Sequence, residues 1–380
     1  MLQQKDKESW LMLYHTTGLS GRRMKRLLDK LGEPAEILAM SAVQLMKAGV
    51  DPDLAEQINA ARGNRTTRQR TQAALEWCSQ DCHHLITCRD AEFPPLLSEV
   101  EDAPPLLFAQ GDPAVLLSPM VAIVGSRNSS HYGRHMATQL STGLARAGFT
   151  IASGLASGID TVAHRAALKA GKPTIAVLGS GLRQIYPASN SGLAAQISHG
   201  DVPGILISEF PLDDPPQAFH FPQRNRIISG MSLGVCVVEA TLRSGSLITA
   251  RLGLEQNRNV FAVPGSVNNP GSRGCHRLLR EGAALAENAA DILEQLEPLI
   301  RGQLALLQEH ELSPDSAQGN EQTVPANCAE LLKLITDDPV TQDNLLQRSG
   351  LSVAELSAKL LALELSGNIC KVAGKWLLTY

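Results

Sequence analysis

The sequence is poor in aromatic residues and contains no long apolar run. Aromatic side chains make up 4% of the 380 residues, whereas the hydrophobic (43%) and charged (19%) contents are ordinary for a globular protein. No apolar stretch reaches the roughly 18 residues that a membrane-spanning helix needs, so we expect no membrane contact. The N-terminal segment MLQQKDKESW also lacks an apolar signal core, which predicts a cytoplasmic protein.

Cysteine is scarce as well. Seven cysteines in a chain of this length do not form the framework of a disulfide-rich protein. One cluster, Cys78, Cys82, His83, His84 and Cys88, has the residue types of a metal site. It lacks the paired C-x2-C knuckles that are typical of zinc sites. Reduced thiols near a helix end are therefore the simpler interpretation, and zinc is the alternative.

Common catalytic motifs are absent. The sequence contains no G-x-x-x-x-G-K-[ST] phosphate loop, no H-E-x-x-H zinc motif and no G-x-S-x-G nucleophile elbow. We therefore expect a protein that is not an enzyme and needs no cofactor.

Charge is unevenly distributed along the chain. The net charge is −4, but residues 121–280 hold 15 Lys/Arg and 7 Asp/Glu, a net +8. Residues 1–70 carry +4 from 12 and 8, and residues 71–120 carry −7 from 1 and 8. The basic surplus at 121–280 indicates either a solvated surface or a site for a polyanionic partner.

Four apolar runs, each ending in a Gly/Ser-rich turn, occupy the basic region. They read VAIVGSR (121–127), TIASGLASGID (150–160), TIAVLGSG (174–181) and VCVVEATLRSGS (235–246). Continuous apolar runs are typical of parallel strands that are buried on both faces. A strand, a glycine turn and a helix in succession form the ligand sites of α/β proteins, so we expect one parallel sheet with an anion-binding edge.

The remaining segments predict flanking domains, as expected for this length. The stretch GLSGRRMKRLL (18–28) resembles a helix-hairpin-helix or SAM-like bundle, with a plain interaction bundle as the alternative. The C-terminal end predicts a winged helix, whose third helix begins at the capping box Ser352–Glu355 and whose hairpin turns near Ala373. The predicted order is a helical SAM-like domain (1–70), a connector packing on the sheet (71–120), the Rossmann-like domain (121–299), a linker (300–325) and the winged helix (326–380).

The first two turns offer a guanidinium and a carboxylate. Gly125 and Ser126 precede Arg127, whose planar charged fork suits a phosphate, although a surface ion pair is the alternative. Gly154 and Gly158 shape the second turn. Asp160 is interpreted as the N-cap of the following helix rather than as a catalytic group.

The later turns add further polar groups. Gly179, Gly181 and Arg183 accompany Tyr186, which either stacks on a base or packs in the core. Arg224, Asn225 and Arg226 fit a turn that opens a helix, where both guanidiniums reach a phosphate; structural clamping is the alternative. Glu239 ends the last strand, and Arg243, Ser244, Gly245 and Ser246 lead into a helix start that favours an anion.

These motifs, in this order, resemble the DNA-processing protein A (DprA/Smf) family over about residues 93–290. The quoted segments are GSR (125–127), SGLASGID (153–160), GSGLRQIYP (179–187), SEF (208–210), FPQRNRIISG (221–230), VVEATLRSGSLITA (237–250) and PGS (264–266) with GCHRLLREGA (274–283). The resemblance implies an extended Rossmann-like domain that binds single-stranded DNA and forms a homodimer. It further implies help in loading RecA recombinase during natural transformation. It also implies that Arg127, Lys172, Arg224 and Arg226 form the DNA pocket, with Arg183 and Arg243 assigned more loosely.

Two other functions compete with this one. A Glu-bearing glycine turn on the same fold also resembles nucleotide phosphoribohydrolases of the LOG type, but their PGG-x-G-T turn is replaced here by VVEA. A scaffold that acts through its helical end domains is the third hypothesis. Residues 323–380 hold 5 Lys/Arg and 6 Asp/Glu, so a protein contact by the tail is at least as plausible as DNA binding.

Overall fold

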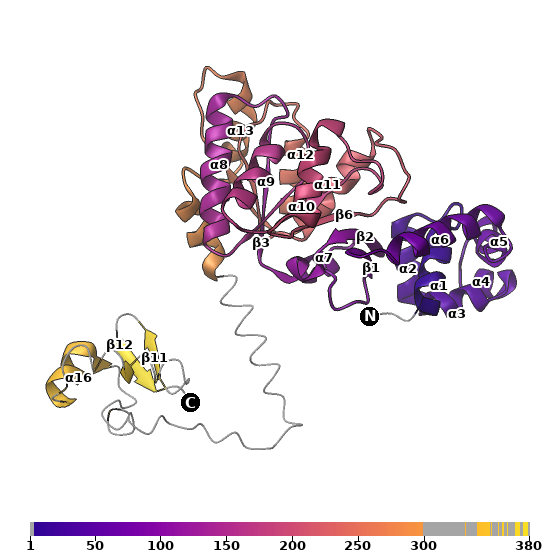
Figure 1. Cartoon of the computed structure of the whole chain (residues 1–380), viewed down its shortest axis with the longest axis horizontal. Coiled ribbons are helices and arrows are strands. Elements are labelled where there is room, and N and C mark those ends of the chain that lie inside the picture. Colours follow the sequence, from indigo (N-terminus) through magenta and orange to yellow (C-terminus); the bar gives the residue numbers. More distant parts are fainter. Residues whose placement is uncertain are drawn as a thin grey trace. The chain divides into compact units, whose positions relative to one another are not determined.

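The computed structural model describes two compact units of the chain. The first covers Met1–Ala305 and the second Leu306–Tyr380. The described residues are 4–298, 331, 340–349, 351, 356, 359–360, 363, 369–372 and 375–378. The first unit contains the N-terminal helices and the sheet (Figure 1).

Six helices form the N-terminal part of the first unit. They are α1 (Gln4–Tyr14), α2 (Gly21–Leu31), α3 (Pro34–Ala39), α4 (Ala42–Lys47), α5 (Pro52–Ala60) and α6 (Arg65–Cys78). Polar side chains cap the N-termini of α2, α4, α5 and α6; for example, Ser20 accepts the N–H of Arg23 in α2, and Asn64 accepts that of Thr67 in α6. Helix α6 runs through residue 70, where the sequence predicted a boundary between the helical domain and the connector.

A nine-stranded sheet follows, in the order β1-β2-β6-β5-β4-β3-β7-β8-β9. The strands are β1 (His83–Thr87), β2 (Leu106–Gly111), β3 (Met120–Val124), β4 (Thr150–Ser153), β5 (Thr174–Val177), β6 (Ile205–Ser208), β7 (Gly234–Val237), β8 (Asn259–Ala262) and β9 (Ala284–Leu285). Strands β3 to β9 pair in parallel, which confirms the predicted Rossmann-like sheet. The acidic segment expected as a connector contributes β1 and β2, which pair antiparallel at one edge.

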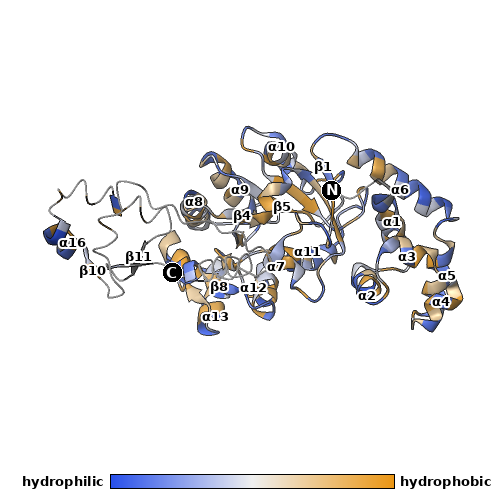
Figure 2. Cartoon of the chain, turned by 90° about the horizontal axis from the view of Figure 1, so that it is seen from below, coloured by the Kyte–Doolittle hydropathy of each residue, from blue (hydrophilic) through white to orange (hydrophobic). Residues whose placement is uncertain are grey.

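Helices cover both faces of the sheet. They are α7 (Pro95–Ser98), α8 (His131–Arg146), α9 (Ile159–Lys169), α10 (Ser191–His199), α11 (His220–Gly230), α12 (Ser246–Glu255) and α13 (Arg273–Arg280). Helices α8 and α9 pack on one face, and α11, α12 and α13 pack on the other. Figure 2 shows apolar strands between helices whose outer sides are hydrophilic.

The chain reverses its direction of travel across the sheet at β3. From β3 it moves outward through β4, β5 and β6, and it then returns to place β7 on the other side of β3. Loops at the carboxyl ends of β3 and β7 therefore diverge. In open α/β sheets, this point is where ligands bind.

The N-terminal helices pack on the antiparallel edge of the sheet. The rings of Tyr14 and Trp77 each meet Phe108 of β2 edge-on, with 6.0 Å between ring centroids. The Tyr14 hydroxyl donates to the carbonyl oxygen of Glu209, and burial raises the pKa of Tyr14 well above its ordinary value. The helices and this edge of the sheet thus share one hydrophobic core.

The second unit contains a small three-stranded sheet. Strands β10 (Val340–Thr341), β11 (Ile369–Val372) and β12 (Lys375–Leu378) lie in the order β10-β12-β11, and α16 spans Gln342–Ser349. Strands β11 and β12 pair antiparallel, as the predicted hairpin requires. The predicted linker, the capping box at 352–355 and the hairpin turn lie outside the described residues.

The histidines of the cluster at 78–88 are held by local contacts, Cys78 and Cys88 are partly buried, and Cys82 is exposed. His83 stacks on Trp77 with ring centroids 4.1 Å apart, and His84 contacts the carbonyl oxygen of Gly111 at 3.1 Å. Burial raises the pKa of the Cys78 thiol to about 11. Among the described residues, no group of three or more His, Cys, Asp or Glu side chains could hold a metal ion. No helix in the described ranges has the length and apolarity needed to cross a bilayer.

Two buried histidines predict a loss of stability in mild acid. Burial lowers the pKa of His15 to about 4 and that of His164 to about 3, against 6.5 in the unfolded chain. The hydroxyl of Thr174 donates to the carbonyl oxygen of Ile151, so it accepts the Nδ1–H of His164. The lowered pKa keeps this ring neutral near pH 7. As the pH falls below 6.5, the unfolded chain therefore binds protons that the folded chain excludes, until the folded pKa values are reached.

We expect each histidine to cost about 2 kcal/mol of unfolding free energy between pH 7 and pH 5. Urea titrations at the two pH values measure this loss. His164→Asn keeps a donor near the Nδ1 position and should remove about half of the pH dependence. Equal wild-type stability at both pH values would contradict the prediction.

Candidate nucleic-acid interface

A pocket of about 400 Å³ lies where β3 and β7 diverge. Its walls are the turn after β3, the start of α9, the first half of α11 and the loop that enters α12. The lining residues are Val124, Gly125, Ser126, Arg127, Asn128, Ala156, Asp160, Phe221, Pro222, Arg224, Asn225, Ile228, Thr241, Ser244, Gly245, Ser246, Ile248 and Thr249. The sequence-predicted turns after β3, β4 and β7 thus meet at one site.

Arg127 is the exposed cation of this pocket. Its guanidinium lies over the ring of Phe221, 5.2 Å from the centroid, which is a cation–π contact. Among the described residues, no carboxylate lies within ion-pair distance of Arg127, so the surface ion pair considered from the sequence is not present. Its charge is therefore available to an anion.

Aromatic rings extend the rim of the pocket beside Arg127. Tyr186 lies 5.8 Å from Phe221, centroid to centroid, and 45% of Tyr186 is exposed. Tyr186 is thus not a core residue. Phe221, to which no role was assigned from the sequence, contacts both Arg127 and Tyr186. Its position one turn before Asn225 on a helix was the available signal.

Arg224 is buried at the base of the pocket, with 4% of its surface exposed. Its Nη1 donates to the carbonyl oxygen of Gly154 at 2.6 Å and to that of Val177, and its Nε donates to Asn225. Burial lowers its pKa to about 10, so it stays charged at neutral pH. Arg224 joins the ends of β4 and β5 to α11, which is the clamping alternative considered from the sequence.

Asp160 is not the N-cap that the sequence predicted. Helix α9 begins at Ile159, with Gly158 at the cap position. The carboxylate of Asp160 instead accepts the backbone N–H groups of Gly154 and Ala156, at 3.1 and 3.3 Å. Burial raises its pKa, and the charge of Arg224 opposes this shift. Asp160 therefore fixes the glycine turn from within.

The two glycines of this turn permit close approaches. A Cβ at Gly158, whose φ is +83°, would stand 2.2 Å from the carbonyl oxygen of Ser126. A Cβ at Gly154 would stand 2.2 Å from Nη1 of Arg224. Because Gly158 has no side chain, the turn after β3 can pack against it, and Gly154 likewise leaves room for the buried guanidinium of Arg224. Both glycines therefore serve the structure of the site rather than offering groups to a ligand.

The loop before α12 supplies hydroxyl groups. The Oγ atoms of Ser244 and Ser246 lie 2.6 Å apart at the edge of the pocket. The N–H groups of Leu247 and Ile248 bond within their own turn and are not free for an anion, whereas Ser244 and Ser246 line the pocket. Arg243 lines a neighbouring hollow with Arg251 and does not line the pocket.

Glu239 lies outside the pocket, under the start of α8. Its Oε2 accepts the N–H of Ser130 at 3.0 Å and the hydroxyl of Ser130 at 2.9 Å. A Cβ at Gly133 or at Gly271 would collide with this carboxylate. Glu239 is thus enclosed, 7% exposed, and anchors the N-terminus of α8.

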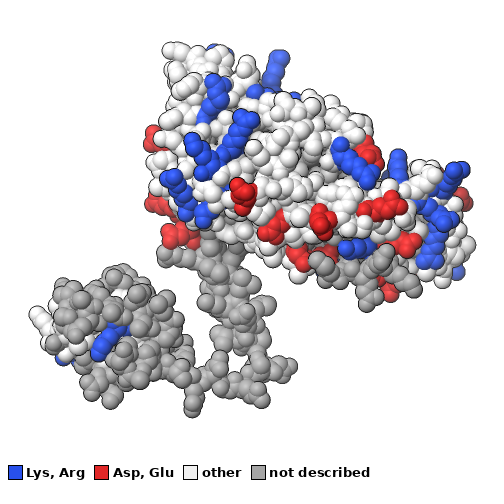
Figure 3. Space-filling view, viewed as in Figure 1, with Lys and Arg blue, Asp and Glu red and all other residues white. Residues whose placement is uncertain are grey.

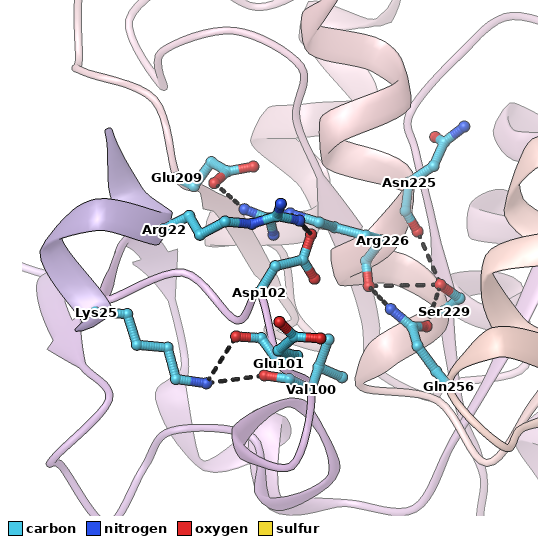
Figure 4. Close-up of polar contacts among 10 residues, drawn as sticks. All are labelled: Arg22, Lys25, Val100, Glu101, Asp102, Glu209, Asn225, Arg226, Ser229 and Gln256. Atoms are coloured by element: carbon cyan, nitrogen blue, oxygen red, sulfur yellow. Dashed lines mark hydrogen bonds and ion pairs between the residues drawn. The ribbon is translucent and has the colours of Figure 1, made fainter. Parts of the chain in front are cut away.

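Arg226 points away from the pocket, contrary to the sequence prediction that both arginines reach one phosphate. Both lie within α11 rather than in a turn, and the guanidinium of Arg226 pairs with Glu209 at 2.5 Å and Asp102 at 3.4 Å. Figure 4 shows Arg22 of α2 meeting the same Asp102, at 3.1 Å. Arg226 therefore ties α11 to the segment before β2 and to the N-terminal helices.

Four other predicted residues are not brought to the pocket. Lys172 precedes β5 and lies at the amino edge of the parallel sheet, whereas the pocket is at the carboxyl edge. Arg183 forms an exposed ion pair with Asp213 at 3.3 Å. Gly179 and Gly181 pack closely against Phe221 and against the backbone of residues 211–212.

Comparisons with known families agree with this architecture. Residues 84–297 match the family described as DNA recombination-mediator protein A, and residues 313–375 match the DprA winged helix domain. Protein Smf of Escherichia coli (strain K12) is 42% identical over 369 residues, 97% of this chain and 95% of that protein. DNA processing protein DprA of Streptococcus pneumoniae is 47% identical over 201 residues, 53% of this chain and 70% of that protein.

Two solved structures are also similar. The X-ray structure of DNA processing protein A from Streptococcus pneumoniae has a TM-score of 0.65 at 35% identity, over 76% of this chain and 97% of that chain. The Helicobacter pylori DNA processing protein A has a TM-score of 0.50 at 30% identity, over 58% of this chain and 97% of that one. Since a family match covers more than half of the chain and a relative aligns along nearly all of it, the protein belongs to the DprA/Smf family of DNA recombination-mediator proteins, with a winged-helix domain in its C-terminal unit.

Proposed function

We propose that the protein binds single-stranded DNA, without sequence preference, in the pocket between β3 and β7. The observation that carries this proposal is the guanidinium of Arg127, which lies over Phe221, has no ion-pair partner among the described residues and lies beside the exposed ring of Tyr186. A guanidinium recognises a backbone phosphate, and an exposed ring stacks on an unpaired base. A duplex hides the faces of its bases, so this combination favours a single strand.

Family membership supports the same ligand. The structure of the Helicobacter pylori relative is described by its single-stranded DNA binding mode. The resemblance further implies that the protein forms a homodimer and loads RecA recombinase onto incoming DNA. We include both partners in the proposal, together with the cytoplasmic location expected from the sequence.

The proposed role is non-enzymatic. Catalysis needs an acid–base group or nucleophile that can reach the ligand. Of the two carboxylates in the predicted glycine turns, Asp160 is held by backbone N–H groups and Glu239 is enclosed beneath α8. The LOG-type hydrolase hypothesis required Glu239 at the ligand, and the geometry offers it no support.

Competition binding tests the proposal. A labelled oligothymidylate is displaced by unlabelled single strands, duplex of the same length, or nucleoside monophosphates. We expect displacement in that order of strength, and weaker binding as salt rises because counterions are released on binding. Equal competition by duplex, a flat salt response, or hydrolysis of a nucleotide that Glu239→Gln abolishes would contradict it.

A further inference from the structure

A second hollow lies between helices α1 and α6, remote in sequence from the pocket at β3. It has a volume of about 380 Å³ and is lined by Glu8, Met12, Gly63, Arg65, Arg68, Gln69, Thr71, Gln72 and Leu75. Arg65, Arg68, Gln69 and Gln72 follow helical i, i+3, i+4, i+7 spacing, so one face of α6 forms most of this wall. We name it the α1–α6 groove.

The groove adjoins a segment without acidic residues. From residue 57 to residue 75 the chain has four arginines, Arg62, Arg65, Arg68 and Arg70, and no Asp or Glu. All four are exposed, and in the described part of the chain none has a carboxylate within ion-pair distance. Arg89 and Arg183, by contrast, each pair with a carboxylate. Figure 3 shows Lys and Arg gathered at the end of the first unit formed by the N-terminal helices.

The chemistry of the lining favours a phosphate backbone over an acidic protein. Guanidinium and amide groups dominate the wall, and Met12 and Leu75 are its larger apolar residues. Protein interfaces are anchored by buried apolar and aromatic side chains, whereas nucleic-acid surfaces rely on Arg and polar groups. Glu8 is the one carboxylate among the lining residues, which include two arginines.

We propose that the α1–α6 groove is a second contact for single-stranded nucleic acid, used by strands that extend beyond the pocket at β3. This inference rests on the proposed function. The α1–α6 groove and the pocket at β3 have no lining residue in common, so a strand that reaches both makes two distinct contacts. Affinity should therefore rise with strand length by more than the number of overlapping binding positions on a longer strand accounts for, because the second contact is intramolecular.

The test compares oligothymidylates of about 8 and about 50 nucleotides, a range that spans typical single-strand site sizes, by fluorescence anisotropy. Arg65→Ala/Arg68→Ala should weaken binding of the long strand about 5- to 30-fold. It should lower the salt slope by about 1.4, at ~0.7 per single-strand phosphate contact, and leave the short strand unchanged. Lys30→Ala/Lys47→Ala removes the same charge from the same helical region outside the groove and should change neither affinity. Circular dichroism confirms folding of both variants.

Three results would overturn the proposal. One is an unchanged long-strand affinity in Arg65→Ala/Arg68→Ala, and another is an equal loss in the lysine control. The third is a loss of poly-glutamate binding with DNA binding intact, which would make the groove a surface for an acidic protein. If the wild type binds neither strand, the proposed function itself fails, so the two failures are distinguishable.

Discussion

Replacing Arg127 with alanine is expected to weaken single-stranded DNA binding about 10- to 100-fold without changing the fold. The side chain is exposed and contacts Phe221, and its loss opens no buried cavity. A charge-assisted bond to a phosphate is worth enough to account for the expected loss. Fluorescence anisotropy gives the affinity, and thermal melting checks that the variant is folded.

Lys172→Ala is the matched control for this experiment. Lys172 is also exposed, and its substitution also removes one positive charge, but it lies at the amino edge of the sheet. The resemblance to the family assigned it to the DNA pocket, whereas the geometry does not. We therefore expect Lys172→Ala to lower DNA affinity only slightly, through the loss of long-range electrostatic attraction. A loss equal to that of Arg127→Ala would mean that the DNA follows a different path.

Replacing Arg224 with alanine is expected to act mainly on stability, at a cost of about 3–5 kcal/mol. The substitution leaves the carbonyl oxygens of Gly154 and Val177 without their donor, and it leaves the buried Asp160 without the nearby positive charge. DNA affinity should fall as well, because the turns after β4 and β5 lose the side chain that joins them to α11. Urea denaturation measures the stability change.

A double-mutant cycle separates the causes. Asp160→Asn removes the buried charge that Arg224→Ala would leave uncompensated, so the double variant should be more stable than the sum of the two single losses predicts. If Arg224→Ala instead melts like the wild type and loses only DNA affinity, Arg224 is a direct ligand contact, as the sequence originally suggested.

The parallel sheet could be predicted because its strands are buried on both faces. Such strands read as continuous apolar runs, as at Val121 and Ile175, and the glycine turns mark their carboxyl ends. The edge of the sheet that forms the pocket followed from the same pattern. The end of the N-terminal helical part could not be predicted from this pattern. The net charge of the sequence changes sign near residue 70, but α6 continues to Cys78 because residues beyond 70, such as Trp77, still pack into the core.

The orientation of individual arginines could not be predicted. Residues two apart on a helix point about 200° apart, so Arg224 and Arg226 must face different partners. Which partner each one meets depends on Gly154, Glu209 and Asp102, which are distant in sequence. The position of Lys172 could not be predicted for a related reason. Sequence motifs give the order of residues along the chain, but they do not give the edge of the sheet at which a residue lies.

Photocrosslinking tests most directly the claim that single-stranded DNA occupies the pocket between β3 and β7. An oligonucleotide of about 8 residues, short enough to occupy one contact, carries a photoreactive thymine analogue. Crosslinked peptides are then identified by mass spectrometry. We predict crosslinks in the peptides that contain Arg127, Tyr186 and Phe221, and their loss in the presence of excess unlabelled single strand. Crosslinks confined to the amino edge near Lys172, or to residues 306–380, would contradict the account.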